Sequence, residues 1–277
     1  MKYLVLGSSG QVGSALTQYI LNKGDEVLEF DIVNDAAQDL RTYENPLLDS
    51  LINQADFVFF LAFDVGGSRY LSQYQNTFDF IDNNTALMLN TFRALKKYQK
   101  PFLFASSQMS NMSYSSYGRA KALGESYTHI MGGLVVKFWN VYGVEHDLEK
   151  SHVITDFILK AKETGVVDMM TDGTEERQFL HADDCCRALM TLAKEYDTVP
   201  RDKELHITNF EWTTILNVAN IIASHFPGST IKPAISKDEV QKNKRNEADD
   251  FITNYWKPEI TIEAGIADII AKMNTAN

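Results

Sequence analysis

Apolar runs alternate with longer amphipathic stretches through the first half of the chain. A strand covered on both faces shows a continuous apolar run, whereas a helix that covers a sheet shows an apolar stripe. On this basis we predict strands at residues 2–6, 25–30, 56–63, 101–107 and 134–140, and helices at 14–21, 75–98 and 117–131. This alternation is typical of the α/β class and predicts a doubly wound, mostly parallel sheet.

Beyond about residue 143 the pattern becomes less regular. Short strand-like segments at 166–170, 178–181 and 206–209 surround predicted helices at 154–162, 183–195 and 213–225. We expect residues 1–143, with contributions from later segments, to form the main domain, and residues 144–277 to form a smaller α/β lobe that caps it. The highly charged stretch 236–250 predicts a solvated loop or one exposed face of a helix.

The predicted helix at 75–98 carries a broad apolar stripe. Packing against the sheet is the commoner use of such a stripe, but part of it could serve an interface between subunits. The stripe consists of Phe78, Ile81, Leu87, Met88, Phe92 and Leu95.

Composition narrows the classes of partner. The chain has 277 residues, a net charge of −11 and a pI of about 5.0, which disfavours nucleic acid and anionic membranes as partners. Its apolar runs are far shorter than the ~20 residues of a membrane-spanning helix, and its start lacks the pattern of a signal peptide. Cys185 and Cys186, the two cysteines, are adjacent in a predicted helix, which favours packed thiols and a cytoplasmic location over a disulfide framework.

A glycine-rich loop joins the first predicted strand to the first predicted helix. Strand, glycine turn and helix in this order direct backbone N–H groups and a helix N-terminus at a pyrophosphate. Asp31 follows the second strand, where an acidic side chain meets the adenosine ribose 2′-OH and disfavours the 2′-phosphate of NADP. The pattern predicts NAD as cofactor, with a plain turn in another α/β domain as the alternative. The loop residues expected to contact NAD are Gly7, Ser9, Gly10, Gln11, Val12 and Gly13.

Tyr117 and Lys121 stand four residues apart in a predicted helix, so they share one face. A phenol loses its proton near pKa ~10, and bringing that pKa to about 7 takes roughly 4 kcal/mol. The Lys121 ammonium favours the phenolate, and an oxidised nicotinamide ring is a natural second contributor. The pair predicts a general base for a hydroxyl group, although Tyr-x-x-x-Lys alone also occurs by chance on exposed helices.

These motifs occur in the order found in a known family. Over nearly its whole length the chain resembles the extended short-chain dehydrogenase/reductases, the NAD-dependent nucleotide-sugar epimerases and dehydratases, which implies a Rossmann fold. The matching segments are Gly7-x-x-Gly10-x-x-Gly13, Asp31, Asp39-Leu40-Arg41, Leu61-Ala62-Phe63, Asn84, Ser106-Ser107, Tyr117-x-x-x-Lys121, Asn140-Val-Tyr-Gly143 and Arg177-Gln-Phe-Leu-His-Ala-Asp-Asp184.

The resemblance implies roles for individual residues. It makes Ser107, Tyr117 and Lys121 the catalytic residues, with Ser106 as a competitor for the place of Ser107. It places Arg177 at the nucleotide diphosphate, where the alternative is a surface arginine paired with Glu175 or Glu176. It also implies a homodimer, a role in polysaccharide biosynthesis and no metal. Further residues implied at the cofactor are Asp39, Leu40, Leu61, Ala62, Phe63, Asn84 and Trp139, with Tyr117 and Lys121, and Asn140 is implied at the substrate.

Two stretches are similar to loops of GDP-sugar members of this family, such as the GDP-fucose synthases. One is Ala62-Phe-Asp-Val-Gly-Gly-Ser68 and the other is Ser151-His-Val-Ile154. In those enzymes the histidine works with a cysteine that this chain lacks, since Gln108 and Met109 follow the serines. Gln108 is not an acid or a base, which disfavours double epimerisation and dehydration and leaves His152 as a substrate-binding or structural residue. Substrate contacts are expected from Gly66, Gly67, Ser68, Ser107, Gln108, Asn140, His152, Val153 and Arg177.

The activity that remains is oxidation at C4 of a nucleotide-diphosphate sugar. We expect a GDP-hexose or GDP-heptose 4-dehydrogenase that releases the 4-keto sugar, with a nucleotide-sugar 4-epimerase as the close alternative. A 4-keto sugar reductase is disfavoured by Asp31, and a non-catalytic NAD-sensing protein by the intact set of Ser107, Tyr117 and Lys121.

Overall fold

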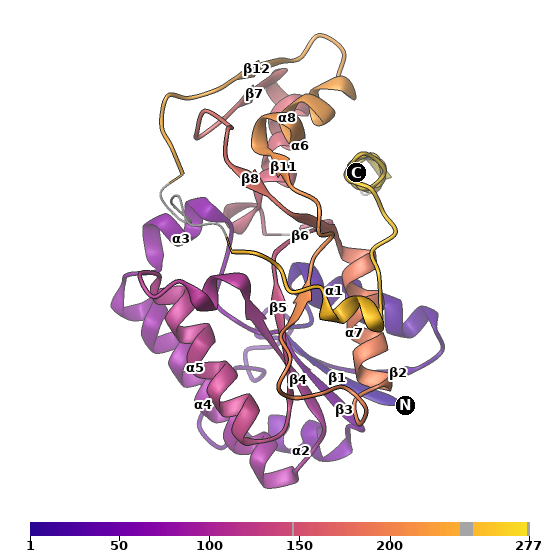
Figure 1. Ribbon diagram of the computed structural model, residues 1–277. Coiled ribbons are helices and arrows are strands. Elements are labelled where there is room, and N and C mark those ends of the chain that lie inside the picture. The colour runs from indigo at the N-terminus through magenta and orange to yellow at the C-terminus, as the bar shows by residue number, and fades with distance from the viewer. Residues whose placement is uncertain (146, 239–245, 276–277) are drawn as a thin grey trace.

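A six-stranded sheet forms the centre of the larger part of the molecule (Figure 1). The computed structural model describes residues 1–145, 147–238 and 246–275. Every strand pairs in parallel with its neighbours, and the order is β10-β5-β4-β3-β1-β2. The predicted doubly wound parallel sheet is therefore confirmed. The strands are β1 (Lys2–Leu6), β2 (Glu26–Phe30), β3 (Phe57–Phe60), β4 (Phe102–Ser107), β5 (Leu134–Phe138) and β10 (Leu205–Ile207).

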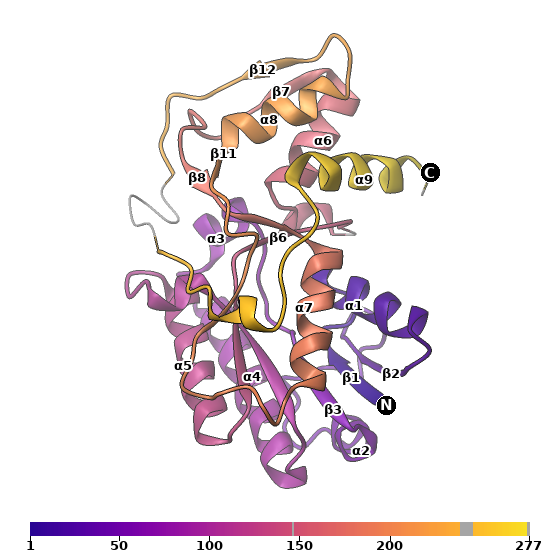
Figure 2. The same ribbon diagram turned by 45° about the vertical axis from the view of Figure 1, so that its right-hand side comes forward.

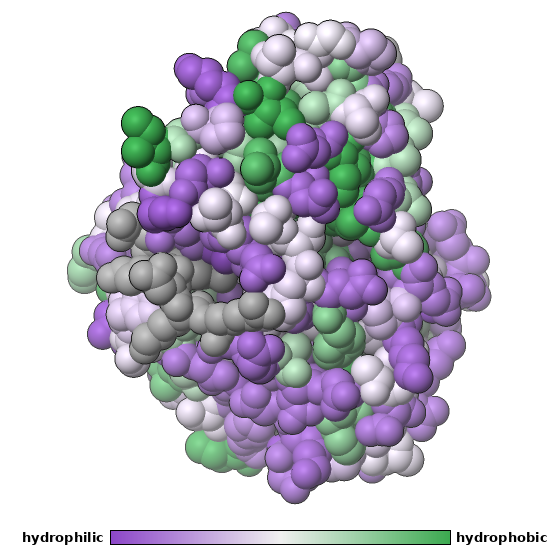
Figure 3. All heavy atoms as spheres, turned by 45° about the horizontal axis from the view of Figure 1, so that its top comes forward, coloured by the Kyte–Doolittle hydropathy of each residue, from purple (hydrophilic) through white to green (hydrophobic). Residues whose placement is uncertain are grey.

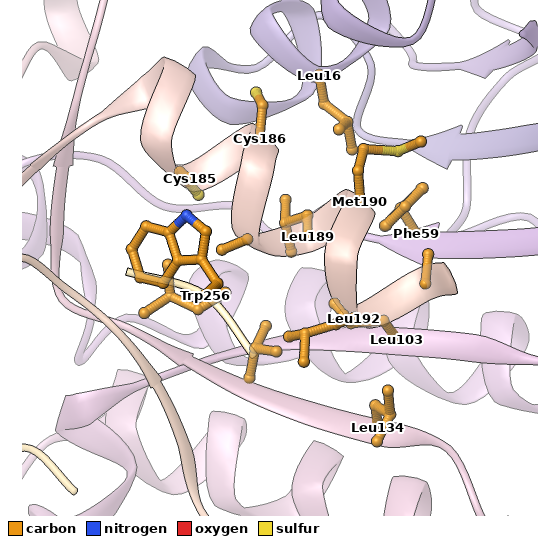
Figure 4. Close-up of a cluster of buried hydrophobic side chains, with 14 of the residues drawn as sticks. Leu16, Phe59, Leu103, Leu134, Cys185, Cys186, Leu189, Met190, Leu192 and Trp256 are labelled. Atoms are coloured by element: carbon orange, nitrogen blue, oxygen red, sulfur yellow. The ribbon is translucent and has the colours of Figure 1, made fainter. Parts of the chain in front are cut away.

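Helices cover both faces of this sheet, which is why its central strands are apolar on both sides. On one face, α1 (Gln11–Asn22) and α7 (Ala182–Lys194) enclose a core with Trp256, which follows the short helix η3 (Phe251–Asn254) (Figure 4). Cys185 and Cys186 are buried, free thiols in this core, as the sequence predicts. The opposite face packs against α2 (Pro46–Gln54), α4 (Phe78–Tyr98) and α5 (Ser116–Ile130).

A smaller lobe has its own apolar core (Figure 2). Because β5 runs directly into β6, which leads into the lobe, the lobe lies at the carboxyl ends of the parallel strands. Seen from the side of the lobe, apolar side chains gather on it, while the rest of this face is mostly hydrophilic (Figure 3). The lobe contains α6 (Val153–Thr164), α8 (Ile215–Ser224) and α9 (Ile262–Thr275), and three strand pairs: β6 (Asn140–Tyr142) with β9 (Phe179–His181), β7 (Val166–Asp168) with β12 (Thr230–Lys232), and β8 (Glu176–Arg177) with β11 (Thr213–Thr214).

The helix predicted at 75–98 is α4, which begins at Phe78 because the Thr77 hydroxyl caps it by accepting from Phe80 N at 3.3 Å. A separate short helix, α3 (Ser68–Tyr74), precedes it and is not indicated by the sequence pattern. The apolar stripe of α4 divides: Leu87, Met88, Phe92 and Leu95 are buried, whereas Phe78 and Ile81 are 79% and 45% exposed.

Three further points concern the remaining elements. Helix α2 was not predicted, although Asn45 caps it and a proline occupies its first turn. Of the stretch 236–250, residues 239–245 lie outside the described residues, and the rest is loop. Among the described helices, none combines the length and the apolar character needed to cross a membrane.

Candidate active site

The glycine loop brings the start of α1 against the end of β1. Gly7 has φ +87°, and a Cβ there would lie 2.7 Å from Ala62 N. A Cβ on Gly13 would lie 1.9 Å from the Gly7 carbonyl oxygen. Within α1, which the structure describes completely, no side chain caps the N-terminus at Gly10 and no acid stands in the first turn. The N–H groups and the positive end of this helix therefore suit a pyrophosphate.

Asp31 joins the glycine loop to the end of β2. Its Oδ2 accepts from Ser9 N at 3.0 Å, and its Oδ1 accepts from Val33 N at 3.0 Å. Ser9 in turn donates from its hydroxyl to Asn34 Oδ1 at 2.8 Å. The acidic side chain is thereby held beside the loop, as binding of an adenosine ribose requires.

The predicted adenine-side residues differ in their surroundings. Arg41 holds the Asp39 carboxylate with Nε–Oδ1 and Nη2–Oδ2 distances of 2.9 and 2.8 Å. These hydrogen bonds keep the pKa of Asp39 below its usual value. Leu40 is buried in the core that α2 and α4 share.

The segment after β3 lies beside the predicted catalytic helix. The Phe63 ring makes an edge contact with Tyr117, with ring centroids 5.7 Å apart. Asn84, fully buried on α4, accepts from Asp64 N at 2.8 Å and donates to Asp64 O at 3.1 Å. Asn84 therefore fixes the loop that leaves β3.

Ser107, Tyr117 and Lys121 meet at the end of β4. The Ser107 side chain reaches Tyr117 closely enough to favour its phenolate and accepts from Met109 N at 3.2 Å, whereas the Ser106 hydroxyl donates to Glu125. Successive strand residues point to opposite faces, so the fold brings Ser107, and not its competitor, to Tyr117. Lys121 Nζ donates to Ala105 O at 2.6 Å and lies 3.8 Å from the centre of the Phe63 ring.

Burial is the main cause of the pKa shifts of Tyr117 and Lys121. Burial raises the pKa of Tyr117 to about 12, against the opposing effect of the Ser107 hydrogen bond. Burial also lowers the pKa of Lys121 to about 7, against the opposing charge of Glu125. Lys121 does not lower the pKa of Tyr117 in this structure, where its Nζ binds Ala105 O and faces the Phe63 ring. Forming the phenolate at neutral pH would cost about 7 kcal/mol without another positive charge.

The two stretches that resemble GDP-sugar enzymes touch each other. Gly67 N donates to Lys150 O at 3.0 Å, and a Cβ on Gly67 would lie 2.5 Å from Ser151 O. A Cβ on Gly66 would lie 2.9 Å from Tyr70 Cβ. These glycines allow the loop after β3 to pack directly on the segment that leads into α6. Ser68 is the first residue of α3 and is exposed.

Asp64 is a charged residue at this junction that the sequence did not single out. Its Oδ1 accepts from Tyr70 Oη at 2.7 Å and from Lys150 Nζ at 3.0 Å. Burial would raise the pKa of Asp64, but these hydrogen bonds and one from Asn83 hold it below its usual value. Its position inside a matched loop was the available signal, but Lys150 lies 86 residues away.

Glu145 is a second residue that the sequence did not indicate. Its Oε1 lies 2.6 Å from His152 Nδ1, and its Oε2 accepts from His152 N at 2.9 Å. Burial opposes the charge of Glu145, yet the hydrogen bonds with His152 keep the pKa of Glu145 below its usual value. The carboxylate thus orients the imidazole of His152, which is half-exposed at the start of α6, with Val153 as the first residue of the helix.

The other predicted substrate residues have protein partners. Both oxygens of Gln108, Oε1 and the backbone carbonyl, accept from Asn246 Nδ2 at 2.6 Å. The backbone N and Nδ2 of Asn140 donate to Gln178 O at 3.3 and 3.1 Å. Arg177 pairs with Asp238, and not with the carboxylates of its sequence neighbours that were the alternative.

Two residues that were predicted to contact the cofactor, Trp139 and Gln11, form hydrogen bonds with other segments of the chain. Trp139, predicted near the nicotinamide, donates from Nε1 to His206 Nδ1 at 3.0 Å. The Gln11 amide lies between Val141 O and Gly143 N, at 3.2 and 3.0 Å in the orientation that satisfies both groups. Val12 packs against the core between α1 and α7.

Among the described residues, His181, Asp183 and Asp268 place potential metal ligands within 4.8 Å of one another. His181 Nδ1 accepts from Asp183 N at 3.2 Å, so the ring hydrogen is on Nε2, 3.1 Å from Asp268 Oδ2. Lys272 Nζ lies 2.7 Å from Asp268 Oδ2 and 3.5 Å from Asp183 Oδ2. His181 therefore caps α7, and the Lys272 ammonium already pairs with both carboxylates.

Comparison with known proteins agrees with this geometry. The sequence model of the NAD dependent epimerase/dehydratase family matches residues 3–208. The chain is 24% identical to a GDP-L-fucose synthase of Sinorhizobium fredii, covering 95% of this chain and 92% of that protein. It is 28% identical to a dTDP-L-rhamnose 4-epimerase of Burkholderia thailandensis, over 49% of this chain and 38% of that protein.

Solved structures share the fold. An epimerase from Methanothermobacter thermautotrophicus superposes with a TM-score of 0.86 at 18% identity, covering 99% of this chain and 92% of that chain. A UDP-glucose 4-epimerase from Thermotoga maritima superposes with a TM-score of 0.77 at 18% identity, covering 100% and 99%.

Proposed function

The chain belongs to the NAD-dependent epimerase/dehydratase family, and from that premise we propose that it oxidises C4 of a nucleotide-diphosphate sugar. The observation that carries the proposal is the meeting of Ser107, Tyr117 and Lys121 in one buried site. In the proposed step, Tyr117 in its phenolate form takes the proton of the C4 hydroxyl and C4 gives up a hydride to the cofactor, which leaves a ketone. Ser107 orients the hydroxyl group.

NAD is the cofactor of this family, and the residues present fit it. When bound, it supplies the hydride acceptor and a positive charge near the phenol. The N-terminus of α1 would hold the pyrophosphate, and Asp31 the adenosine ribose. Lys121 would hold the nicotinamide ribose in place of its contact with Phe63. In this proposal residues 1–143 bind NAD and residues 144–277 bind the sugar nucleotide, while β10 and α7 return to the main sheet.

A GDP-sugar is the substrate that we favour. The loop at 62–68 and the segment at 151–154 lie in contact, and both resemble GDP-sugar enzymes. The relative from Sinorhizobium fredii, named a GDP-L-fucose synthase, matches over almost the whole chain. Release of the ketone makes the chain a GDP-hexose or GDP-heptose 4-dehydrogenase.

A 4-epimerase is the second candidate. Tyr117 and Lys121 are only 9% and 3% exposed, which favours a site that retains its intermediate. A 4-keto sugar that turns within such a site can take back hydride on its other face. The relatives named dTDP-L-rhamnose 4-epimerase and UDP-glucuronate 4-epimerase also support this outcome.

Incubation with a panel of GDP- and UDP-sugars, followed by mass spectrometry and NMR, tests both candidates. Loss of two hydrogens with formation of NADH identifies the dehydrogenase, and an unchanged mass with an inverted C4 identifies the epimerase. Tyr117→Phe is expected to lose at least a thousandfold in activity, while NAD binding persists, because the proton acceptor is gone. Tyr127→Phe, the same change on the same helix against Phe92, is the matched control. Normal turnover by Tyr117→Phe, or no turnover of any sugar by the wild type, would refute the proposal.

The homodimer and the cytoplasmic location stay predictions. The exposed Phe78 and Ile81 of α4 and Ile130 of α5 support a contact between subunits at this pair of adjacent helices. Light scattering of the purified protein measures its oligomeric state directly.

A further inference from the structure

Three polar residues form a buried row across neighbouring strands. Ser106 on β4 is in register with Lys137 on β5, which is in register with His206 on β10. Residues in register on adjacent strands share one face of a sheet. Ser106, Lys137 and His206 are 2%, 3% and 2% exposed. The row faces α5, the helix that carries the catalytic pair.

Carboxylates link the row from end to end. Lys137 Nζ lies 2.6 Å from Glu204 Oε1 and 3.7 Å from Glu125 Oε2. The Ser106 hydroxyl donates to the other oxygen of Glu125. At the far end, His206 Nε2 lies 2.8 Å from Glu204 Oε2. Burying an ion costs several kcal/mol unless it is paired and hydrogen-bonded, so the row requires each of its partners.

This row meets the catalytic pair at Glu125. Glu125 follows Lys121 by one turn of α5, so the two side chains share a face. Lys121 Nζ binds the carbonyl of Ala105, whose neighbour Ser106 binds Glu125. The charge of Glu125 favours the ammonium form of Lys121 against burial.

We propose that Glu125 is a positioning residue that keeps Lys121 charged during catalysis, and that Lys137 attenuates this effect by pairing with Glu125. The inference rests on the proposed function, in which Lys121 must be an ammonium. Within the described part of the chain, the titratable groups around Lys121 are Tyr117 and Glu125 on its own helix. Those around Glu125 are Lys121 and Lys137, behind which lie Glu204 and His206 of the β10 segment.

Two substitutions are expected to act in opposite directions. Glu125→Gln keeps the shape of the side chain and removes its charge, so the titration midpoint of Lys121 should fall by about one pH unit. Lys137→Gln removes the competing cation, so the midpoint should rise. Glu163→Gln removes an equal charge from an exposed site on α6 and should leave the midpoint unchanged. General damage to the fold does not produce opposite shifts.

The measurement is the carbon-13 NMR titration of the lysine side chains, with Lys121 assigned by its absence in Lys121→Met. Thermal unfolding checks that each variant is folded, and Glu125→Asp, which keeps the charge, should retain the midpoint of Lys121. An unchanged midpoint in Glu125→Gln, or shifts of the same sign in both variants, would overturn the inference.

Activity gives a second measurement. The basic limb of the pH profile of kcat/KM should move with the NMR midpoint in each variant. If the wild type oxidises no sugar, the proposed function fails, while the NMR titration still decides the role of Glu125.

Discussion

Alanine substitutions at two glycines of the same loop should have different effects: one should lower the stability of the protein, and the other should weaken the binding of NAD. A Cβ on Gly13 would lie 1.9 Å from Gly7 O, far inside an ordinary contact. A Cβ on Gly10 would lie 3.4 Å from the same oxygen, which is an ordinary contact. Gly13→Ala should therefore strain the protein itself, whereas Gly10→Ala should place a methyl group where the pyrophosphate approaches.

The size of each effect follows from these contacts. In Gly13→Ala, α1 and the end of β1 must separate by about 1.5 Å to restore a 3.4 Å contact. Overpacking of this kind costs about 1–3 kcal/mol, which lowers the Tm of a chain of this size by about 2–4 °C per kcal/mol. Gly10 has φ −69° and ψ 168°, which alanine adopts freely, but alanine is a poorer N-cap than glycine, so Gly10→Ala should cost about 0.5–1 kcal/mol.

Thermal unfolding with and without NAD measures the stability of each variant, and calorimetric titration measures its affinity for NAD. Gly13→Ala should unfold at a lower temperature in the absence of NAD. Gly10→Ala should unfold at a temperature close to that of the wild type, above that of Gly13→Ala, and lose about tenfold or more in NAD affinity. Wild-type stability in Gly13→Ala, or wild-type affinity in Gly10→Ala, would show that the loop is not the tight cradle described above.

Two further predictions concern charged side chains. Asp31→Ala should bind NAD more weakly and lose its discrimination against NADP, because the repelling carboxylate and its bond to Ser9 N are gone; equal NAD and NADP affinities in the wild type would contradict this. Glu145→Gln should be less stable than the wild type near neutral pH, because the folded-state pKa of Glu145 lies below 4.5. That contribution is present above the unfolded value and is lost as pH falls through the folded one, so unfolding curves of the two proteins should converge in acid; a constant gap at every pH would argue against it.

The parts of the fold that could be predicted from the sequence are those that depend on residues close together in the chain. The first strand, the glycine loop and Asp31 lie within one strand-helix-strand unit, and their geometry depends on neighbours in sequence. Helix α2 was missed although Asn45 and Pro46 are a standard start signal, because its apolar period is short.

The contacts that could not be predicted join residues that are far apart in the sequence. Asp64 meets Lys150 and Ser106 meets Glu125 only because separate elements pack side by side. A serine pair at a strand end is ambiguous in sequence, since alternation puts one on each face. The position of α5 decides that Ser107 meets Tyr117.

The chain by itself determined the α/β class, the family and its dependence on NAD, because these follow from periodicity and from motifs that are local in sequence. Tertiary structure alone decided the electrostatics of Tyr117 and Lys121. Spacing on a helix predicts that Lys121 favours the Tyr117 phenolate, but burial raises the pKa of Tyr117 to about 12 and lowers that of Lys121 to about 7. The physical reason is desolvation, which depends on everything that packs around a group and on no single neighbour in the sequence.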